Sequence, residues 1–232
     1  MGRRVRRLDQ LLSSLGYCSR KDARALCAAG RVEVNGAPCD DASTRVDGTK
    51  VTLDGEPLEF PDGLLVMVHK PVGVVCTHDS REGQRLYDLL PERWQSRDPK
   101  VTSIGRLDRD TSGLILVTDQ GPLVQKLTSP KHHVEKTYVA LLDVEPPASL
   151  VNDFAAGIEL REEDGALVGT LPAKLTLLGE KQAEVTVQEG RYHQVRRMFA
   201  ARGVHVVSLH RTRFGPWSLD ASLAPGQWRA VT

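Results

Sequence analysis

Three charged residues gather where a polar loop leads into an apolar run, within residues 104–117. Arg106, Asp108 and Arg109 fall within four positions, and the apolar stretch 114–117 that follows is typical of a buried strand. Nearby guanidinium groups favour the ionised form of a carboxylate, so Asp108 is expected to stay charged. Loops held against a buried strand commonly carry catalytic side chains. A surface turn with a satisfied aspartate is the simpler interpretation, and this segment alone does not separate the two.

Two further segments offer side chains that could act with this carboxylate. Tyr138 lies in residues 136–142, which are predicted to form a strand, and residues 192–202 are predicted to form a helix. The apolar positions of that helix place Arg196 at the edge of the buried stripe and Arg197 further out. Each segment also has a structural interpretation, as a core tyrosine and as a phosphate-binding helix without catalysis.

The formal net charge of +1 over 232 residues conceals two basic segments. Residues 1–36 contain eight Arg and Lys against three acidic residues, whereas residues 190–215 contain six Arg and no acidic residue. The rest of the chain is therefore acidic on balance. Concentrated positive charge on an otherwise acidic chain predicts a polyanionic partner. Two solvated helix faces are the alternative, and the exclusion of acids from the second segment weighs against it.

The composition is that of an ordinary globular chain, with 40% hydrophobic and 26% charged residues. It has no apolar run of membrane length and no signal-peptide pattern, so we expect a cytoplasmic protein. The four cysteines lack regular spacing and the histidines are scattered, which predicts reduced thiols and no metal site. Neither a phosphate-cradling glycine loop nor a nucleophile elbow occurs, so we expect no nucleotide-cofactor chemistry.

Helical periodicity organises the N-terminal part of the chain. Leucines at i, i+3, i+4 and i+7 from Leu8 predict an amphipathic helix over residues 5–15. Ser19 can cap a second helix, and Asn35-Gly36 follows an alternating stretch as a hairpin signal. Four basic residues fall on the outer side of the second helix and its exit: Arg20, Lys21, Arg24 and Arg31.

A polar segment rich in Pro and Gly, residues 56–63, predicts a domain boundary. We therefore expect a small α/β domain at residues 1–60 and a larger domain at residues 61–232. Strands outnumber helices in the larger domain without regular alternation, which predicts an α+β fold with a mixed, largely antiparallel sheet. Lys70 follows an apolar strand and precedes a Pro-containing turn, so it is expected to project from the strand end.

The N-terminal residues resemble a known RNA-binding module, that of ribosomal protein S-four, also called the αL motif. The resemblance covers about the first sixty residues and rests on Arg7-Leu8-Asp9-Gln10-Leu11-Leu12, Gly16, Ser19-Arg20, Ala23 and the stretch from Gly30 to Gly36. A helix-turn-helix that reads DNA is the alternative, and the immediate Asn-Gly hairpin disfavours it.

The larger domain resembles the pseudouridine synthases, from residue 64 to the end of the chain. The resemblance rests on Gly105-Arg106-Leu107-Asp108 followed by Thr111-Ser112-Gly113-Leu114, on Lys136-Thr137-Tyr138 and on Gln194-Val195-Arg196. Segments 132–138 and 191–201 are most similar to the branch that acts on small-subunit (16S) ribosomal RNA. These enzymes convert uridine to pseudouridine without a cofactor, by breaking N1–C1′ and joining C5 to C1′.

The resemblance implies roles for individual residues. Asp108 would be the catalytic carboxylate, which could attack C1′, add to the base or promote proton removal from the sugar. Arg196 would pair with Asp108, and Tyr138 would stack on the uracil and help to move the C5 proton. The target uridine must leave its stack to reach the pocket. The implied RNA-binding residues are Arg20, Lys21, Arg24, Arg31, Lys70, Arg106, Arg191, Gln194 and Arg197.

The sequence thus predicts a monomeric pseudouridine synthase whose partner is ribosomal RNA, most simply 16S RNA. Two alternatives stay open. One is a synthase for a site in 23S RNA, with the same chemistry. The other is a non-catalytic RNA-binding or assembly factor on the same fold, which the presence of Asp108, Tyr138 and Arg196 disfavours.

Overall fold

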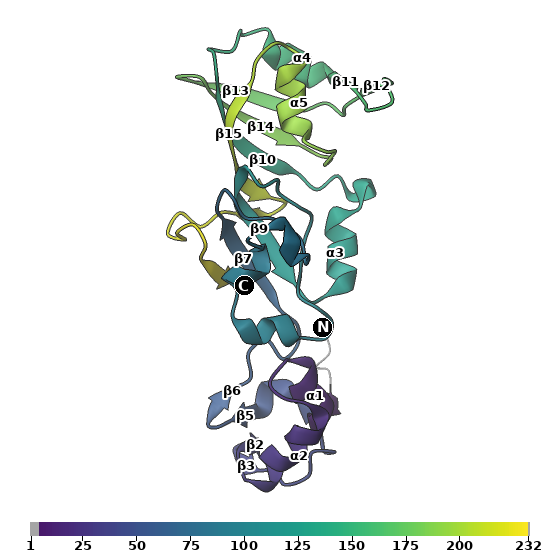
Figure 1. Ribbon diagram of the computed structural model, residues 1–232, viewed down its shortest axis with the longest axis vertical. Helices are drawn as coiled ribbons and strands as arrows, with labels where there is room; N and C mark the ends of the chain where they lie inside the picture. Colours follow the sequence, from purple (N-terminus) through teal and green to yellow (C-terminus); the bar gives the residue numbers. More distant parts are fainter. Residues whose placement is uncertain (1–4, 232) are drawn as a thin grey trace.

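The computed structural model describes residues 5–231, so Arg3 and Arg4 of the basic N-terminus lie outside the described residues. The molecule is elongated, with a small N-terminal lobe at one end of a long sheet domain (Figure 1). The elements of the N-terminal lobe are β1 (Val5–Arg7), α1 (Leu8–Ser14), α2 (Arg20–Ala28), β2 (Val32–Val34), β3 (Ala37–Pro38), β4 (Arg45–Asp47), the 3-10 turn Gly48–Lys50, β5 (Val51–Leu53) and β6 (Glu56–Pro57).

The N-terminal lobe has its own hydrophobic core, built mainly by the two helices. Leu8, Leu11 and Leu12 of α1 are fully buried and pack against residues as far along the chain as Leu58. Ser19 caps α2 by accepting a hydrogen bond from Asp22 N at 3.1 Å, as predicted. The predicted helix over residues 5–15 was too long at its start, because residues 5–7 pair with β4 as an antiparallel strand.

A long mixed sheet forms the larger domain, with strand order β13-β14-β10-β15-β9-β7-β17 among the described residues. Neighbouring strands are antiparallel except β15 and β9, which run parallel. The prediction of an α+β fold with a largely antiparallel sheet is therefore confirmed. The strands are β7 (Leu65–Lys70), β8 (Thr102–Ser103), β9 (Thr111–Thr118), β10 (Lys136–Leu142), β13 (Lys174–Gly179), β14 (Gln182–Val187), β15 (Val206–Phe214), β16 (Trp217–Ser218) and β17 (Trp228–Ala230), with a separate ribbon of β11 (Glu159–Arg161) and β12 (Leu167–Gly169).

Three short helices lie along this sheet: α3 (Gly121–Thr128), α4 (Leu150–Ala156) and α5 (Gln194–Ala200). Phe154 of α4 and Phe199 of α5 are fully buried and their rings meet at 4.8 Å, so these helices cover the β13–β14–β10 end of the sheet (Figure 1). The predicted helix over residues 192–202 is shorter than expected. Further 3-10 turns span Ser80–Glu82, Leu86–Leu89, Glu92–Ser96 and Pro130–His132.

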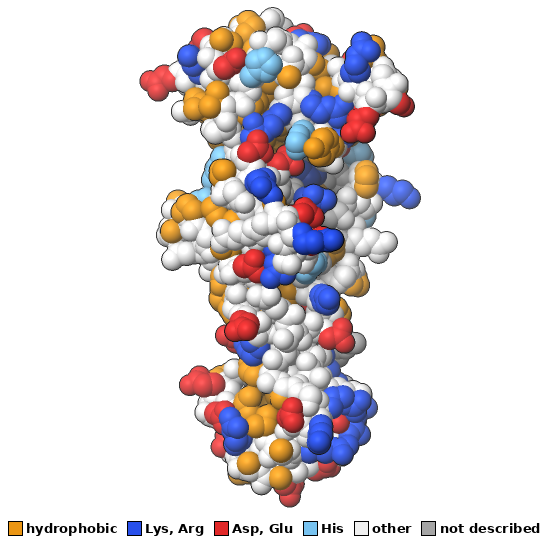
Figure 2. Space-filling model, in the orientation of Figure 1, with side chains coloured by type: hydrophobic (Ala, Val, Ile, Leu, Met, Phe, Trp, Pro, Cys, Tyr) orange, Lys and Arg blue, Asp and Glu red, His pale blue; other side chains and the backbone are white. Residues whose placement is uncertain are grey.

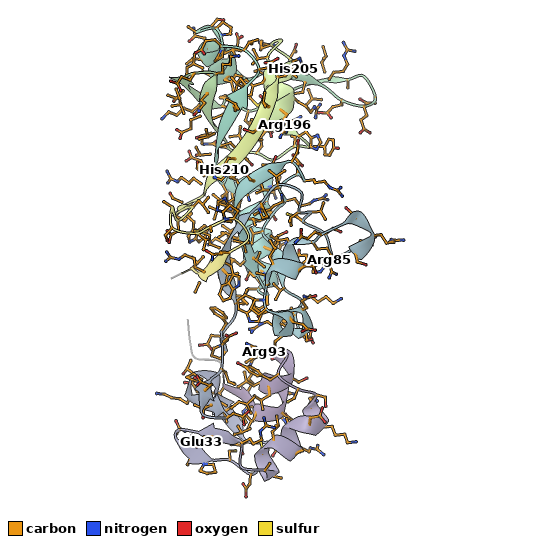
Figure 3. The ribbon with its side chains drawn as sticks, turned by 60° about the vertical axis from the view of Figure 1, so that its left-hand side comes forward. Glu33, Arg85, Arg93, Arg196, His205 and His210 are labelled. Carbon is orange, nitrogen blue, oxygen red and sulfur yellow. The ribbon has the colours of Figure 1, made fainter. Side chains whose placement is uncertain are left out.

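The segment that joins the two lobes is held by the turn Glu92–Ser96. Glu59 accepts hydrogen bonds from Arg93 and, at 2.9 Å, from the indole of buried Trp94. Arg97 is 2% exposed and donates to the carbonyl of Phe60 at 2.9 Å. Arg93 lies between the lobes (Figure 3). Residues 59 and 60 are therefore anchored to residues 93–97 of the larger domain, and the connection is not a free linker.

Within residues 5–231, none of the helices is long and apolar enough to cross a membrane.

Candidate active site

Asp108 lies in the loop between β8 and β9, and a buried lysine holds that loop through its backbone carbonyls. The Nζ of Lys70 donates to the carbonyls of Pro71, Asp108 and Thr111 at 3.0, 3.0 and 2.7 Å. Lys70 is fully buried, and burial lowers its pKa to about 8. Lys70 ends its strand as expected, but the prediction that it binds RNA was wrong, because its buried ammonium group is taken up by three backbone carbonyls.

The carboxylate of Asp108 is half-buried, with its side chain 34% exposed. The imidazole of His193 lies beside it, with Nε2 3.4 Å from Oδ1. His193 precedes α5 in a left-handed conformation, with φ 48°, and its ring stacks on that of Tyr192 at 3.9 Å. Tyr192 is 71% exposed, so this pair of rings extends from Asp108 to the surface.

The prediction that Arg196 pairs with Asp108 was wrong, because its carboxylate partner is Asp110. Arg196 Nη2 lies 2.9 Å from the carboxylate of Asp110 and also donates to the Asp110 carbonyl, while Nη1 donates to the carbonyl of Val206 at 2.9 Å. Arg196 thus ties the far end of the Asp108 loop to α5 and to the start of β15 (Figure 3 shows its position beside that strand). Asp108 and Asp110 are two positions apart, so the contact still holds the loop.

A cavity of about 450 Å³ opens directly beside Asp108. Tyr138 on β10 and Arg211 on β15 form part of its wall, and Arg106 is exposed at its rim. Tyr138 and Arg211 are opposite each other across the strand pair, which brings a buried aromatic ring and a buried guanidinium group to the same side of the sheet. The volume lies within the roughly 300–1,000 Å³ range of small-molecule sites.

Buried polar atoms without a hydrogen-bond partner concentrate at this cavity. Across residues 5–231 there are three such side-chain atoms: Thr111 Oγ1, Arg196 Nε and Arg211 Nη2. All three residues line the cavity. Because an unsatisfied buried polar group costs about 1–3 kcal/mol, its persistence calls for an explanation, and a ligand in the cavity would supply one.

Three predicted RNA-binding residues on and before α5 behave differently from one another. Gln194 is buried at the cavity wall, accepts from Arg191 N at 3.0 Å and donates to Glu189 at 2.8 Å, so its side chain orients neighbouring residues, and its contact with RNA stays a prediction. Arg191 is half-buried at the cavity and is held by Glu189. Arg197 is directed away from the cavity towards Glu162, at 3.3 Å.

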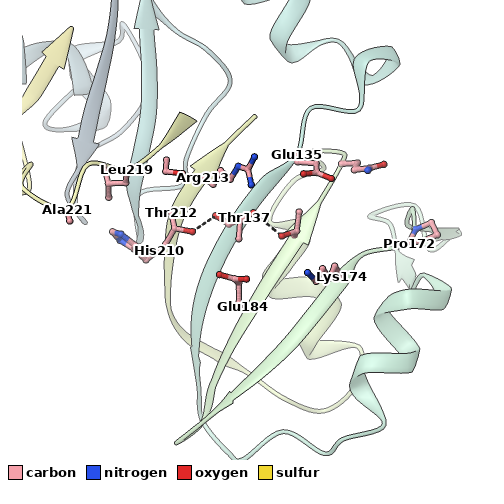
Figure 4. A pocket seen from close by; sticks show the side chains of 13 residues that line it. Glu135, Thr137, Pro172, Lys174, Glu184, His210, Thr212, Arg213, Leu219 and Ala221 are labelled. Atoms are coloured by element: carbon pink, nitrogen blue, oxygen red, sulfur yellow. Dashed lines mark hydrogen bonds between the residues drawn. The ribbon is translucent and has the colours of Figure 1, made fainter. Parts of the chain in front are cut away.

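A wider and shallower hollow lies on the opposite face of the sheet (Figure 4). Its volume is about 670 Å³, and its wall includes Thr137 and Thr186, whose hydroxyls are hydrogen-bonded to each other at 2.9 Å. Glu184 and Lys174 bring opposite charges to this face. None of the three unpartnered buried atoms belongs to it, so the smaller cavity is the better candidate for a substrate site.

The basic residues of α2 lie on the outer face of the N-terminal lobe, where Lys and Arg side chains gather (Figure 2). Lys21 and Arg24 are exposed, as predicted. Arg20 and Arg31 are exposed too, but they already contact Asp9 at 3.1 Å and Asp54 at 2.6 Å. Binding of a polyanion to this face would therefore compete with the surface ion pair of Arg31 and with the contact of Arg20 to the buried carboxylate of Asp9.

Comparison with known proteins places this geometry in a family. Residues 64–201 match the RNA pseudouridylate synthase family and residues 6–53 match the S4 domain. The ribosomal small subunit pseudouridine synthase A of Vibrio parahaemolyticus is 42% identical over 97% of this chain and 96% of its own length. The enzyme of the same name from Escherichia coli is 40% identical, with the same coverage of both chains. A crystal structure of a pseudouridylate synthase superimposes with a TM-score of 0.68 at 36% identity, covering 98% of this chain and 96% of that chain.

The chain therefore belongs to the RNA pseudouridylate synthase family and is an RNA pseudouridine synthase. Within that family it is of the RsuA-like type, which combines an RNA-binding S4 domain with the synthase domain. Both resemblances seen in the sequence are thereby confirmed.

The sequence interpretation missed two residues of the cavity. Arg211 counted only as part of a basic segment, although it is 1% exposed. His193 was considered only as a metal ligand, although its ring reaches Asp108. A signal for Arg211 does exist, because it lies two positions after the apolar Leu209 and strand alternation turns both to the same side.

Proposed function

We propose that this enzyme isomerises a uridine of 16S ribosomal RNA, with Asp108 as the catalytic carboxylate. The observation that supports the site is the coincidence, in one cavity, of Asp108, the Tyr138 ring and all three unpartnered buried polar atoms of the described chain. The relatives named for the small ribosomal subunit support the RNA. The same proposal includes action as a monomer in the cytoplasm.

The protein groups divide the work by position. Asp108 acts on the flipped uridine, while Tyr138 stacks on the uracil and assists loss of the C5 proton. Lys70 and Arg196 hold the two ends of the Asp108 loop and so fix the carboxylate for reaction. Arg106 and Arg191 hold phosphates at the cavity rim, and Arg197 does so outside the cavity, where phosphate replaces its contact with Glu162.

The N-terminal lobe adds sequence-independent affinity. Arg20, Lys21, Arg24 and Arg31 present positive charge on one face, and binding of phosphates there releases counterions. In this division of roles, the N-terminal lobe contributes to the choice and binding of the RNA, and the cavity carries out the reaction.

The experiment is a comparison of substrates. Purified enzyme is incubated with C5-tritiated 16S and 23S transcripts, free and in partly assembled particles, and tritium release is followed before the modified uridine is mapped. Release from 16S RNA at a single position supports the proposal. Release confined to 23S RNA contradicts the proposed target RNA but still supports the isomerisation of uridine. Absence of release from any RNA, with binding intact, would favour a non-catalytic assembly factor.

A further inference from the structure

Two cations line the inner part of the cavity without a close ion pair to a carboxylate among the described residues. Arg211 donates its Nε to the carbonyl of Leu114 at 2.7 Å, and Lys136 donates its Nζ to the carbonyl of Val134 at 2.8 Å. In the described part of the chain, no carboxylate is in ion-pair contact with either group. An uncompensated buried charge is costly for the folded state, so such a charge commonly marks a functional site.

Arg211 is the more firmly positioned of the two. Its neighbour across the parallel strand pair is Gly113, where any Cβ would come within 2.3 Å of the Arg211 carbonyl, so β9 and β15 approach closely at this point. The guanidinium carbon lies 6.0 Å from the Tyr138 ring centre and 5.1 Å from that of Phe214. Nε is used by Leu114, whereas the buried Nη2 has no acceptor among residues 5–231. The structure thus holds one fixed, charged N–H donor without a partner at the wall that Tyr138 shares.

The chemistry of the reaction supplies an acceptor for that donor. When N1–C1′ breaks, the bonding pair stays on the uracil, and the resulting negative charge is spread over O2 and O4. Addition of a carboxylate to C6 places an electron pair on O4 as an enolate. Proton removal from the sugar expels the same uracil anion. All three routes open to Asp108 therefore develop negative charge on a carbonyl oxygen of the base.

We propose that Nη2 of Arg211 donates a hydrogen bond to a carbonyl oxygen of the flipped uracil and stabilises the negative charge that the ring carries while it is detached from C1′ of the sugar. The pair returns when C5 bonds to C1′, the C5 proton leaves and N1 takes up a proton, so charge and atoms balance. This inference rests on the proposed function in taking the Asp108 cavity as the uridine site. It assigns Arg211 a catalytic role beside Asp108 and Tyr138.

Other cations of the site are less suited to this role. Arg196 uses both terminal nitrogens on Asp110 and Val206, which leaves only its Nε without a partner. Lys136 is half-buried on a flexible stem, and its ammonium group already donates to a carbonyl. A donor that is aimed in advance needs no reorganisation during the reaction, and loss of one such donor commonly lowers the rate by about 10²–10³.

The test uses the sensitivity of the rate to the stability of the ring anion. Single-turnover rates are measured at saturating RNA for wild type and Arg211→Met, with a target uridine and with 5-fluorouridine at the same position. The rate is that of consumption of the parent nucleoside, followed by chromatography of nucleoside digests, because C5 of 5-fluorouridine has no proton to lose. Fluorine withdraws electrons and stabilises the ring anion by itself. We expect Arg211→Met to lower the rate on uridine by a factor of about 10²–10³. The factor on 5-fluorouridine should be about ten times smaller. The matched control is Arg213→Met, because Arg213 lies on the same strand but lines the hollow of the opposite face.

Three results would overturn the inference. An equal loss on both RNAs means that Arg211 is merely structural. Full recovery of the Arg211→Met rate at high pH means that the arginine serves the ionisation of Asp108 and not the base. If Arg211→Met melts well below wild type, the decision passes to Arg211→Lys, which keeps the charge, and an equal loss on both RNAs in that variant rejects the role. Normal turnover by Asp108→Asn would instead reject the proposed site itself, so the two failures are distinguishable.

Discussion

The two ends of the molecule use arginine and lysine in opposite ways. In the N-terminal lobe, exposed cations meet carboxylates: Arg20 contacts Asp9, and Arg31 contacts Asp54. At the cavity, Lys70 and Arg211 are almost inaccessible to solvent and their donors go to backbone carbonyls. Burial of a charge without a counter-charge disfavours folding, whereas an exposed ion pair contributes little either way.

The difference separates affinity from catalysis. Exposed cations can exchange a carboxylate for an RNA phosphate at small cost, and such contacts weaken as salt rises. Buried cations cannot change partners easily, so below about pH 8, where Lys70 keeps its proton, they hold fixed positive charge near Asp108. We therefore expect changes at the cavity to affect rate and stability, and changes at the lobe to affect binding and its salt dependence.

The largest effect is expected from Asp108→Asn, which removes the reactive charge and preserves volume. Turnover should fall by on the order of 10⁴, with RNA affinity nearly unchanged, because phosphate contacts remain. Tritium release and filter binding measure the two quantities on the same RNA. Near-normal turnover would contradict the role of Asp108 and make Asp110 the next candidate.

Arg196→Met should lower the single-turnover rate at saturating RNA by about 10², since a loop that is displaced by about 1 Å loses catalytic geometry. Asp110→Asn should produce much of the same loss, because Asp110 is the partner of Arg196. The control is Arg197→Met, which should weaken binding and leave the rate intact. A double variant of Arg196 and Asp110 that is slower by the full product of the single losses would show that the two residues act independently.

Lys70 makes the stability of the catalytic domain depend on pH. Its pKa is lowered by burial to about 8, below the ordinary 10.5, so the folded protein binds this proton less tightly than the unfolded chain. The cost of the buried charge is complete below pH 8 and is relieved as pH rises from about 8 towards 10.5. Relative to Lys70→Met, wild type should gain on the order of 3 kcal/mol across that window.

Urea unfolding of both proteins between pH 7.5 and 10.5 measures this gain, with exposed Lys126→Met as the control. Parallel pH dependences for wild type and Lys70→Met would refute it.

Two truncations test whether the lobes are separable. A chain that begins at residue 59 keeps Glu59 and Phe60, whereas one that begins at residue 61 leaves Trp94 and Arg97 without those acceptors. We expect both to fold, with the shorter chain less stable by about 1–3 kcal/mol. Both should bind RNA more weakly and with a flatter salt dependence than the full chain. An unchanged salt slope would contradict RNA binding by the N-terminal lobe.

The smallest effect is expected for Lys21→Gln combined with Arg24→Gln on the exposed face of α2. Affinity should fall a few-fold at moderate salt, and the slope of log K against log salt should decrease by about 1.4–1.8 if each residue holds one phosphate. The rate at saturating RNA should not change. A lower rate at saturation would show that the lobe also takes part in catalysis.

Local patterns predicted most of the elements but not their contacts. The run 136–142 was correct to the residue, and the α2 cap followed from Ser19, because neighbouring residues determine both. The parallel pairing of β15 with β9 joins segments almost a hundred positions apart, which periodicity does not encode.

Side-chain partners were harder to predict than elements. Arg196 was expected at a loop carboxylate, and the structure gives Asp110 in place of Asp108, a choice that depends on side-chain rotamers two positions apart. Lys70 was correctly placed at a strand end, but its ammonium group turns inward onto the carbonyl of Pro71 and two carbonyls of the distant Asp108 loop. Sequence patterns indicate which residues lie near the reaction, and the tertiary fold decides which of them touch.

The anchored connection between the lobes has a consequence for how the enzyme measures its substrate. Glu59 and Phe60 are held by Arg93, Trp94 and Arg97, so the basic face of α2 stands at a fixed separation from the Asp108 cavity. An RNA that engages both must present a flipped uridine and a phosphate run at that spacing. If the basic face binds RNA as proposed, we expect the molecule to act as a caliper, which selects targets by the distance between two features of the folded RNA as well as by the bases around the uridine.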